Sequence, residues 1–428
     1  MDTIFALASA RGKSGVAVIR LSGPQAHSVL EKLAGKLPPP RHTALRKLRS
    51  MEGALLDTAL VVLFDQGASF TGEQVAEVMT HGSIATIAAL ETCLAQEHGL
   101  RMAEPGEFTR RALENGVLDL TQVEALSDLL EAETESQRRQ AMRVLDGALG
   151  RLVDGWRAYL LKAAALVETS IDFVEEDVGN FDDLILAELR IVQSQLVAEL
   201  AGQAARERVQ SGFEIALVGS VNAGKSTLLN ALAGRDAAIT SDIAGTTRDV
   251  IELRMDIGGY AVTLLDTAGL RDTQEEIESI GIARGQKRAA AADFRIILCD
   301  GPDSPPLVAP NPADIVTFSK SDMYPGHSGG LSGATGAGLD DLLQQIMQRL
   351  SAMTAQDGLS VRRRHQQAMT GAAAALESAI EKLEDQAYIP ELVAADIRQA
   401  MTALDSLIGR IDVEDLLGDI FASFCIGK

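Results

Sequence analysis

The chain is poor in aromatic residues and in cysteine. Aromatic side chains make up 4% of its 428 residues, and alanine and leucine fill most apolar positions, which favours helix. The three cysteines, Cys93, Cys299 and Cys425, are far apart and form no Cys-x-x-Cys pair. Neither a disulfide framework nor a zinc site is therefore predicted, and this cysteine usage fits a reducing cytoplasm.

Long apolar runs and an excess of positive charge are also lacking. No window offers the about 20 apolar residues of a membrane span, and no basic region precedes the short apolar run near the start, so we expect neither a membrane segment nor a signal peptide. With a net charge of -21, the chain as a whole repels nucleic acid, and any such contact needs a local basic patch or a basic partner. Basic clusters occur at 41–49, 138–143 and 362–365, and each alone is more typical of an exposed helix face.

The pattern of apolar residues predicts a multidomain protein, since 428 residues exceed a single hydrophobic core. Residues 1–117 alternate strand-like and helical runs, which predicts an α+β domain. Residues 118–208 and 351–428 keep a helical period and together predict an all-α domain. Residues 209–350 alternate strands with helices, which is typical of an α/β domain with a mostly parallel sheet. We therefore expect this α/β domain to be inserted in the helical domain.

The stretch "GSVNAGKSTLLN" (219–230) has the spacing of a phosphate-binding loop. Gly219 stands five residues before Gly224, as the pattern requires, whereas the Gly-Lys-Ser of "ARGKSG" (10–15) has Leu7 at that position. The loop follows the strand-like "FEIALVG" and opens a helix, so backbone N–H groups and the helix start favour an anion there. Lys225 is predicted to reach the β- and γ-phosphates, and Ser226 to bind Mg²⁺. The predicted contacts are Asn222, Ala223, Gly224, Lys225, Ser226 and Thr227.

Further motifs, each at a predicted strand end, indicate GTP. Asp266 opens "DTAG" and suits the Mg²⁺ shell, Gly269 can meet the γ-phosphate, and Thr247 is the natural second Mg²⁺ ligand. Asp322 in "SKSD" can accept two hydrogen bonds from the guanine edge, a donor pair that adenine lacks. The predicted P-loop GTPase site thus adds Ser241, Asp242, Ile243, Ala244, Gly245, Thr246, Thr247, Asp266, Thr267, Ala268, Gly269, Ser319, Lys320, Ser321, Asp322, Ser332, Gly333 and Ala334.

Some positions depart from the usual GTPase pattern. Ser319 replaces the usual Asn or Thr of the guanine motif, and Gly333 follows Ser332 where alanine is usual. Leu270 takes the place of the glutamine that orients water in Ras-type enzymes. Another group must then orient the water, and the acidic run at 271–281 could supply a carboxylate. A bound cation could supply positive charge, and the side chain of Asn222 is a plausible oxygen ligand for it.

Beyond these motifs, the whole chain resembles one family, the bacterial tRNA-modification GTPases MnmE (TrmE). The resemblance lies in "DTIFALASARGKSGVAVIRLSGP" at the start, "SFTGEQVAEVMTHG" (69–82), "RMAEPGEFTRRALENGVLDLTQVEAL" (101–126), the GTPase motifs and the terminal "FCIGK". Other GTPases share the nucleotide motifs but not these flanks.

The resemblance implies a fold and a reaction. It implies a folate-binding N-terminal domain that drives formation of a homodimer, and a helical domain with the GTPase inserted. It further implies action with a flavin-containing partner, MnmG (GidA), in a heterotetramer or larger complex. Together they would add a (carboxymethyl)aminomethyl group to C5 of the wobble uridine of certain tRNAs. The one-carbon unit would come from 5-formyltetrahydrofolate or another tetrahydrofolate derivative, in the cytoplasm and without a membrane.

The resemblance also implies roles for single residues. K⁺ would be held by Asn222, Thr246 and the backbone oxygens of Ser241 and Ile243, and Glu278 would orient water. Catalytic residues are then Glu278 and Lys225. The folate contacts fall on Arg20, Glu77, Val117 and Lys428. The family often has a lysine where this chain has Val117, so only a backbone contact could be kept there. Cys425 fits a small buried thiol better than a nucleophile, and the cluster at 362–365 could touch tRNA.

Two other functions remain open at this stage. An RNA-binding ribosome-assembly GTPase would carry a basic RNA-binding domain and would not bind folate, and the acidic balance and the "FCIGK" ending argue against it. A GTP-regulated scaffold without enzymatic activity would need a broken Lys225 or Asp266, and both are intact.

Overall fold

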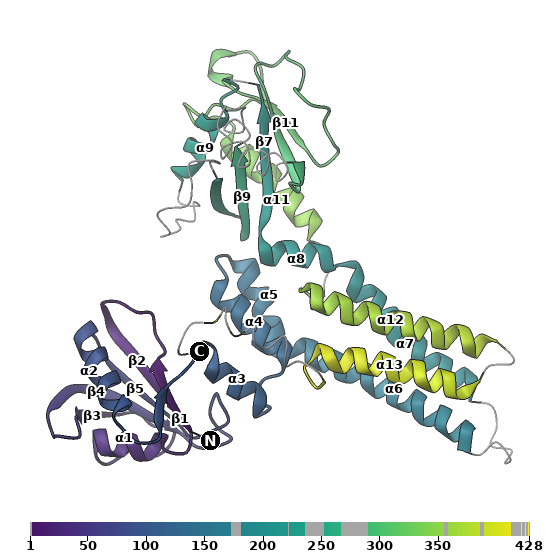
Figure 1. Cartoon of the computed structure of the whole chain (residues 1–428). Helices are drawn as coiled ribbons and strands as arrows, with labels where there is room; N and C mark the ends of the chain where they lie inside the picture. Colours follow the sequence, from purple (N-terminus) through teal and green to yellow (C-terminus); the bar gives the residue numbers. More distant parts are fainter. Residues whose placement is uncertain are drawn as a thin grey trace, which may run out of the picture. The chain divides into compact units, whose positions relative to one another are not determined.

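A computed structural model of the chain describes residues 2–172, 181–220, 222–235, 252–266, 290–354, 358–385 and 389–411, together with 421, 424 and 427. Along the chain, a mixed domain is followed by long helices, an α/β segment and further helices (Figure 1). Contacts group the chain into two compact units, one of 1–127, 145–157 and 401–428 and one of 128–144 and 158–400. These units are defined by contacts alone, so the domain boundaries given above stay a prediction.

The N-terminal part is a six-stranded sheet with helices on both faces. Its strand order is β3-β4-β5-β2-β1-β6. Helices α1 and α2 cover the face that carries Phe5, Ile19 and Val78, while Phe108 of α3 packs on the opposite face against Ile4. The α+β prediction is therefore confirmed. The elements are β1 Thr3–Leu7, β2 Ser14–Ser22, α1 Ala26–Ala34, β3 Ala44–Arg49, β4 Leu55–Phe64, β5 Val75–Gly82, α2 Ile84–Ala95, β6 Leu100–Met102 and α3 Glu107–Glu114.

The first part of the helical segment predicted at 118–208 is divided into shorter helices between residues 120 and 172. That stretch forms three helices, broken at 132–134 and at 146–147. In the later helices the buried residues recur at helical spacing, as in α12, whose inward positions include Met369, Ala372 and Leu376, and α12 packs on α7. The helices are α4 Leu120–Glu131, α5 Glu135–Leu145, α6 Ala148–Asp172, α7 Asp182–Ala201, α8 Gln203–Ser211, α12 Arg363–Glu384 and α13 Pro390–Leu407. None of the helices in the described ranges is both long and apolar enough to cross a bilayer.

The segment between α8 and α12 is a five-stranded sheet of order β11-β10-β7-β9-β8. Strands β7, β9, β10 and β11 are parallel, and only the edge strand β8, which the sequence pattern did not predict, is antiparallel. Near-continuous apolar strands such as "FRIILC" suit a parallel sheet buried on both faces. The elements are β7 Phe213–Gly219, α9 Lys225–Ala233, β8 Glu252–Ile257, β9 Tyr260–Asp266, β10 Phe294–Cys299, β11 Ile315–Phe318, η2 Ser321–Met323 and α11 Leu339–Met353.

Candidate functional site

Three predicted motifs meet at one edge of the α/β sheet. Because β7, β9, β10 and β11 are parallel, their carboxyl ends lie at the same edge, where open α/β sheets bind ligands. The residues that end or follow these strands are Gly219, Asp266, Asp300 and Ser319. The sheet topology thus places the phosphate loop, the DTAG aspartate and the guanine motif together.

The phosphate loop has the backbone that its glycines permit. A Cβ on Gly219 would lie 2.6 Å from the carbonyl oxygen of Leu298, so only glycine lets β7 end this close to β10. Gly224 has φ +79° and caps α9, and Asn222 also lies in the left-handed region, with φ 65°. Left-handed residues directly before α9 turn the backbone sharply into the helix N-terminus, which is a favourable place for an anion.

Two side chains of this loop are of the kinds that bind a triphosphate and its metal. Lys225 is 5% exposed, and its Nζ donates to the carbonyl oxygens of Gly219 and Ser220, both at 2.8 Å. The Ser226 hydroxyl donates to Oδ2 of Asp266 at 3.1 Å. A hydroxyl and a carboxylate are the hard oxygen ligands that Mg²⁺ prefers, so these two residues fit that ion.

The guanine motif lies against the phosphate loop. Ser319 is buried, and its backbone N–H donates to the carbonyl of Cys299. Its Cβ would lie 3.5 Å from a Cβ placed on Gly224, so the two loops are in contact. Lys320 adopts φ 58°, and Asp322 is exposed in η2. An exposed carboxylate at this edge is able to receive the guanine N–H groups.

The predicted base-contacting loop at Ser332, Gly333 and Ala334 packs against α9, the helix that follows the phosphate loop. A Cβ on Gly333 would come within 2.9 Å of the carbonyl oxygen of Thr227 in α9, which explains why glycine stands there instead of alanine. Ser332 is buried and its hydroxyl accepts the N–H of Thr335 at 3.2 Å. In this chain the serine therefore holds the loop turn itself.

Several predicted site residues lie outside the described residues, and the structure does not bear on them. They are Ser241, Asp242, Ile243, Ala244, Gly245, Thr246, Thr247, Thr267, Ala268, Gly269, Glu278 and Lys428. Cys425 and Leu270 also fall there. Among the proposed K⁺ ligands, Asn222 alone is described, and its amide oxygen is chemically suited to the ion.

The sequence reasoning missed one residue of this edge, Asp300. Its Oδ2 accepts the hydroxyl of Ser220 at 2.6 Å, and its carbonyl oxygen accepts the hydroxyl of Tyr324 at 3.4 Å. Its position could have pointed to it, since Asp300 is a polar residue directly after the apolar strand β10. Asp300 together with burial raises the pKa of the neighbouring Cys299 thiol, burial being the larger cause.

In the N-terminal sheet, Arg20 and Glu77 lie opposite each other. They are register partners on β2 and β5, and Nε of Arg20 donates to Glu77 at 2.8 Å. The guanidinium also lies over the rings of Phe70 and Phe108, 5.4 and 5.7 Å from their centroids. Charged groups beside aromatic faces suit a polar heteroaromatic ligand. The third described position, Val117, is exposed, and its backbone N–H donates to the carbonyl oxygen of Ala112 at 2.8 Å.

A buried network of charges lies next to this pair. Arg111 contacts Glu73, Glu107 and the side chain of Asp2, at 2.8–3.1 Å. Burial acts to raise the pKa of Glu107, but hydrogen bonds from Arg101, a backbone N–H and Arg111 outweigh it, so the pKa lies below its usual value. The ion pairs of Arg111 fasten α3 to Asp2 and to Glu73, which is a structural role.

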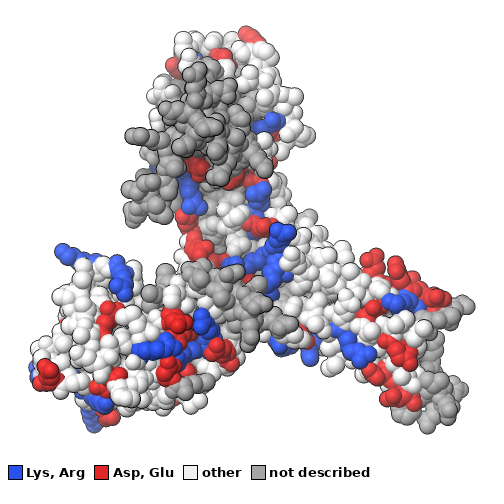
Figure 2. Space-filling view, viewed as in Figure 1, with Lys and Arg blue, Asp and Glu red and all other residues white. Residues whose placement is uncertain are grey.

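The positive clusters of the sequence are partly neutralised by acidic neighbours. Arg138 and Arg139 on α5 both pair with Glu135, and Arg362 before α12 pairs with Asp128. Blue and red side chains are mixed over much of the face in Figure 2. The balance of charge on this face therefore does not single out a site for nucleic acid.

Comparisons with known proteins cover the chain from end to end. A model of the MnmE helical domain matches residues 120–425, and a model of the GTP-binding protein TrmE N-terminus matches residues 3–117. The tRNA modification GTPase MnmE of Roseobacter denitrificans is 53% identical over 429 residues, and that of Cereibacter sphaeroides (strain ATCC 17029) is 54% identical, with 100% of both chains covered in each case.

Among solved structures, the G domain of the T. maritima FeoB iron transporter matches 32% of this chain and 98% of its own at 22% identity. Its TM-score of 0.23 is too low to carry an argument. The family models and the full-length relatives decide the assignment instead, and the chain belongs to the MnmE (TrmE) family of tRNA modification GTPases.

Proposed function

We propose that this GTPase hydrolyses GTP at the described sheet edge, with Mg²⁺ and with stimulation by K⁺. The observation that carries the proposal is the pair of contacts in the phosphate loop, where Lys225 is folded onto loop carbonyls and Ser226 meets Asp266. A triphosphate would take Lys225 from those carbonyls, since a phosphate oxygen is the stronger acceptor. Asp322 would select guanine.

The remaining roles complete the site. Ser226 and Thr247 would hold Mg²⁺, and Asn222, Ser241, Ile243 and Thr246 would hold K⁺. When bound, the two cations supply positive charge at the phosphates, where charge develops during hydrolysis. Glu278 would orient the attacking water, because Leu270 cannot. The support is the chemistry of these residue types and the family resemblance, since most of them lie outside the described residues.

The N-terminal sheet supports the proposal of a homodimer. On the face away from α1 and α2, Val18, Met79, Leu60 and Leu45 form a row across four strands, following the registers Val18↔Met79, Leu60↔Met79 and Leu45↔Leu60. Leu45 and Leu60 are 62% and 42% exposed. An apolar row of this kind is costly in water, and a second copy of the sheet would cover it.

The proposed folate contacts lie beside the same row. Arg20 and Glu77 are two residues along β2 and β5 from Val18 and Met79, and side chains two apart share a face. A homodimer covering the row would therefore also shield a tetrahydrofolate held by Arg20, Glu77, the backbone at Val117 and Lys428. We assign the one-carbon unit for the tRNA reaction to this ligand, when bound there.

The proposed reaction joins the two sites. With a flavin-containing partner, MnmG (GidA), the homodimer would form a heterotetramer or larger complex in the cytoplasm and add a (carboxymethyl)aminomethyl group to C5 of the wobble uridine. GTP hydrolysis would drive rearrangement rather than the modification chemistry itself. The support for this division is that the nucleotide residues and the Arg20–Glu77 pair belong to different compact units.

Helix α5 is the element through which the nucleotide site would act on the helical segment. The backbone N–H of Ser136 donates to the carbonyl of Gly259 at 3.1 Å, and its hydroxyl donates to the same atom. Gly259 is in the turn between β8 and β9, and β9 ends at Asp266. An ion pair between Glu133 and Arg254 of β8 adds to this contact.

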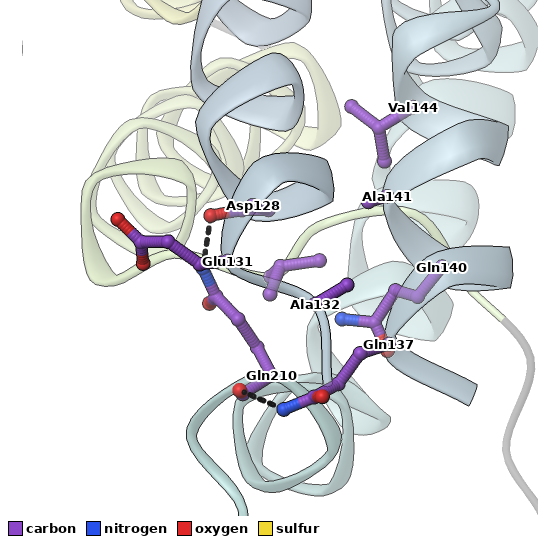
Figure 3. A pocket seen from close by; sticks show the side chains of 9 residues that line it. Asp128, Glu131, Ala132, Gln137, Gln140, Ala141, Val144 and Gln210 are labelled. Carbon is purple, nitrogen blue, oxygen red and sulfur yellow. Dashed lines mark hydrogen bonds between the residues drawn. The ribbon is translucent and has the colours of Figure 1, made fainter. Parts of the chain in front are cut away.

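Helix α5 also contacts α8, the helix that precedes β7. Gln137 donates to the carbonyl of Gln210 at 2.9 Å, and the Gln210 amide donates to Asp128 at 2.5 Å; both contacts line a small pocket (Figure 3). Thus α5 contacts both α8 and the antiparallel pair β8–β9, and a movement of that pair would be transmitted to α5.

The testing experiment compares GTP hydrolysis by the purified protein in KCl and in NaCl at equal ionic strength. The proposal expects a large advantage in KCl that is lost in Asn222→Ala and kept in Asn230→Ala, a matched control on the exposed side of α9. Equal rates in both salts would reject the potassium assignment. Mass spectrometry of tRNA nucleosides from cells lacking the protein, with and without the gene restored, tests the modification step.

The ribosome-assembly alternative makes the opposite forecast for the N-terminal sheet. It needs no folate, so Arg20→Ala would leave its function unchanged, whereas the proposal expects the modified uridine to disappear. The full-length identity to tRNA modification GTPases argues for the second result.

A further inference from the structure

Asp300 lies between the two loops that would hold the nucleotide, and it contacts both. Its carboxylate accepts the hydroxyl of Ser220, the second residue of the phosphate loop, at 2.6 Å. Its carbonyl oxygen accepts the hydroxyl of Tyr324, directly after the η2 turn that carries Asp322. One residue is therefore tied to the phosphate side through its side chain and to the guanine side through its backbone.

The side-chain contact bears on Lys225. The carbonyl of Ser220 accepts Nζ of Lys225 and also the N–H of Ala223, so the orientation of the Ser220 peptide shapes the first turn of the loop. On one side of this peptide, the close approach to Leu298 fixes the position of Gly219. The hydrogen bond from the Ser220 hydroxyl to Asp300 fixes the position of Ser220 itself.

The backbone contact bears on the base. Tyr324 packs edge-on against Phe318, with ring centroids 6.1 Å apart, and its hydroxyl comes within 3.0 Å of a Cβ placed on Gly301. The loop after β10 is thus held close to the turn of Asp322. Displacing Asp300 would disturb both ends of the site together.

We infer that Asp300 is a positioning residue of the nucleotide site, which holds the phosphate loop through Ser220 and couples it to the guanine loop through Tyr324. It does not touch the reacting atoms. The inference rests on the proposed placement of GTP at this edge. It predicts that Ser220 and Asp300 act as one unit.

The test is a double-mutant cycle on the full-length protein, with Ser220→Ala, Asp300→Ala and both together, read as the Kd for GDP and for a non-hydrolysable GTP analogue. Loss of one hydrogen bond is expected to weaken binding about fivefold, and the double variant should bind no more weakly than either single variant. Asp300→Asn keeps an acceptor oxygen for Ser220 and should restore affinity to within about twofold.

Two controls separate this role from others. Asp303→Asn removes an equal charge three residues on, at an exposed position, and should leave affinity unchanged. Tyr324→Phe should reduce the ratio of the affinity for GDP to that for inosine diphosphate. Inosine diphosphate lacks the exocyclic amino group whose hydrogen bond Asp322 would accept. Melting temperatures without nucleotide should stay close to that of the parent protein, because the Ser220–Asp300 bond is exposed.

The outcomes are distinct. If the parent protein binds no guanine nucleotide, the placement of GTP fails. If it binds but Ser220→Ala and Asp300→Ala weaken binding additively, or not at all, the inference is wrong. If Asp300→Asn is as harmful as Asp300→Ala, the charge of Asp300 matters rather than its bond to Ser220, which also overturns the inference.

Discussion

Replacing Gly219 by alanine should weaken GTP binding far more than it destabilises the protein. The added Cβ would lie 2.6 Å from the carbonyl oxygen of Leu298 and 3.2 Å from Cβ of Ala223. The first contact is with the backbone of β10, an inner strand paired on both sides, so the neighbour cannot rotate away. Overpacking of this kind typically costs about 1–3 kcal/mol.

This strain lowers both the affinity for GTP and the stability of the protein without nucleotide. Without nucleotide, the loop can move off β10 and relieve part of the strain. Bound phosphate needs the original loop, so the relieved part returns as lost affinity. If about 2 kcal/mol is relieved in this way, GTP affinity falls about 30-fold. A remainder of about 1 kcal/mol would lower the melting temperature of the α/β domain by about 2–4 °C.

The matched control is Gly155→Ala in α6. There a Cβ would meet nothing within 4 Å, and the residue is exposed in the middle of a helix. The same substitution should therefore stabilise the protein by about 1 kcal/mol and leave GTP affinity unchanged. Fluorescent nucleotide titration and calorimetry measure both quantities. Unchanged affinity in Gly219→Ala would refute the steric reasoning and the assignment of this loop.

Three other variants test the remaining structural arguments. Glu107→Gln should destabilise the N-terminal sheet by about 3 kcal/mol at pH 7. Because the pKa of Glu107 is lowered in the folded protein, the stability it contributes is present above the ordinary value of 4.5 and is lost as pH falls below it. The difference in unfolding free energy between variant and parent, measured in denaturant, should therefore be smaller at pH 3 than at pH 7. Leu60→Asp should shift the mass measured by light scattering from dimer to monomer, while Asp at exposed Leu161 of α6 should not; a dimer in both would remove the apolar row as the interface. Ser136→Ala should leave GTP hydrolysis within about twofold and lower tRNA modification in a reconstituted reaction, and an equal loss of both would count against α5 as the coupling element.

The sequence was sufficient to predict the phosphate loop because its requirements are local. Gly219, Gly224 and Lys225 lie within seven residues, and each is demanded by the backbone or by the ligand. The alternation of strands and helices also predicted the parallel sheet, and so the edge at which Asp266 and Ser319 meet. Spacing along the chain carried this information.

Contacts between distant segments left no such signal. Arg111 meets Asp2 and Glu73, which are 109 and 38 residues away, and nothing in the pattern of charges pairs them. Asp300 follows a strand, as Asp266 does, but belongs to no motif. The helical prediction for 118–208 also gave no sign of the break at 132–134, where the Gln137 side chain accepts the backbone N–H groups of Glu133 and Thr134 before α5.

The sheet pairing explains why the contact of Ser136 with Gly259 would respond to the nucleotide. Strand β9 is hydrogen-bonded to β7 on one side and to β8 on the other, so it cannot slide along β7 without breaking several pairs. A displacement of Asp266 would therefore be carried by β9 together with its paired neighbours to the turn at Gly259, about 20 Å away for a strand of seven residues. At the far end, the contacts with the segment before and at the start of α5 are the Gly259 carbonyl, which accepts from Ser136, and a partly exposed ion pair between Glu133 and Arg254. Under the proposed coupling, these contacts would respond first, and α5 would be the part of the helical segment that senses hydrolysis.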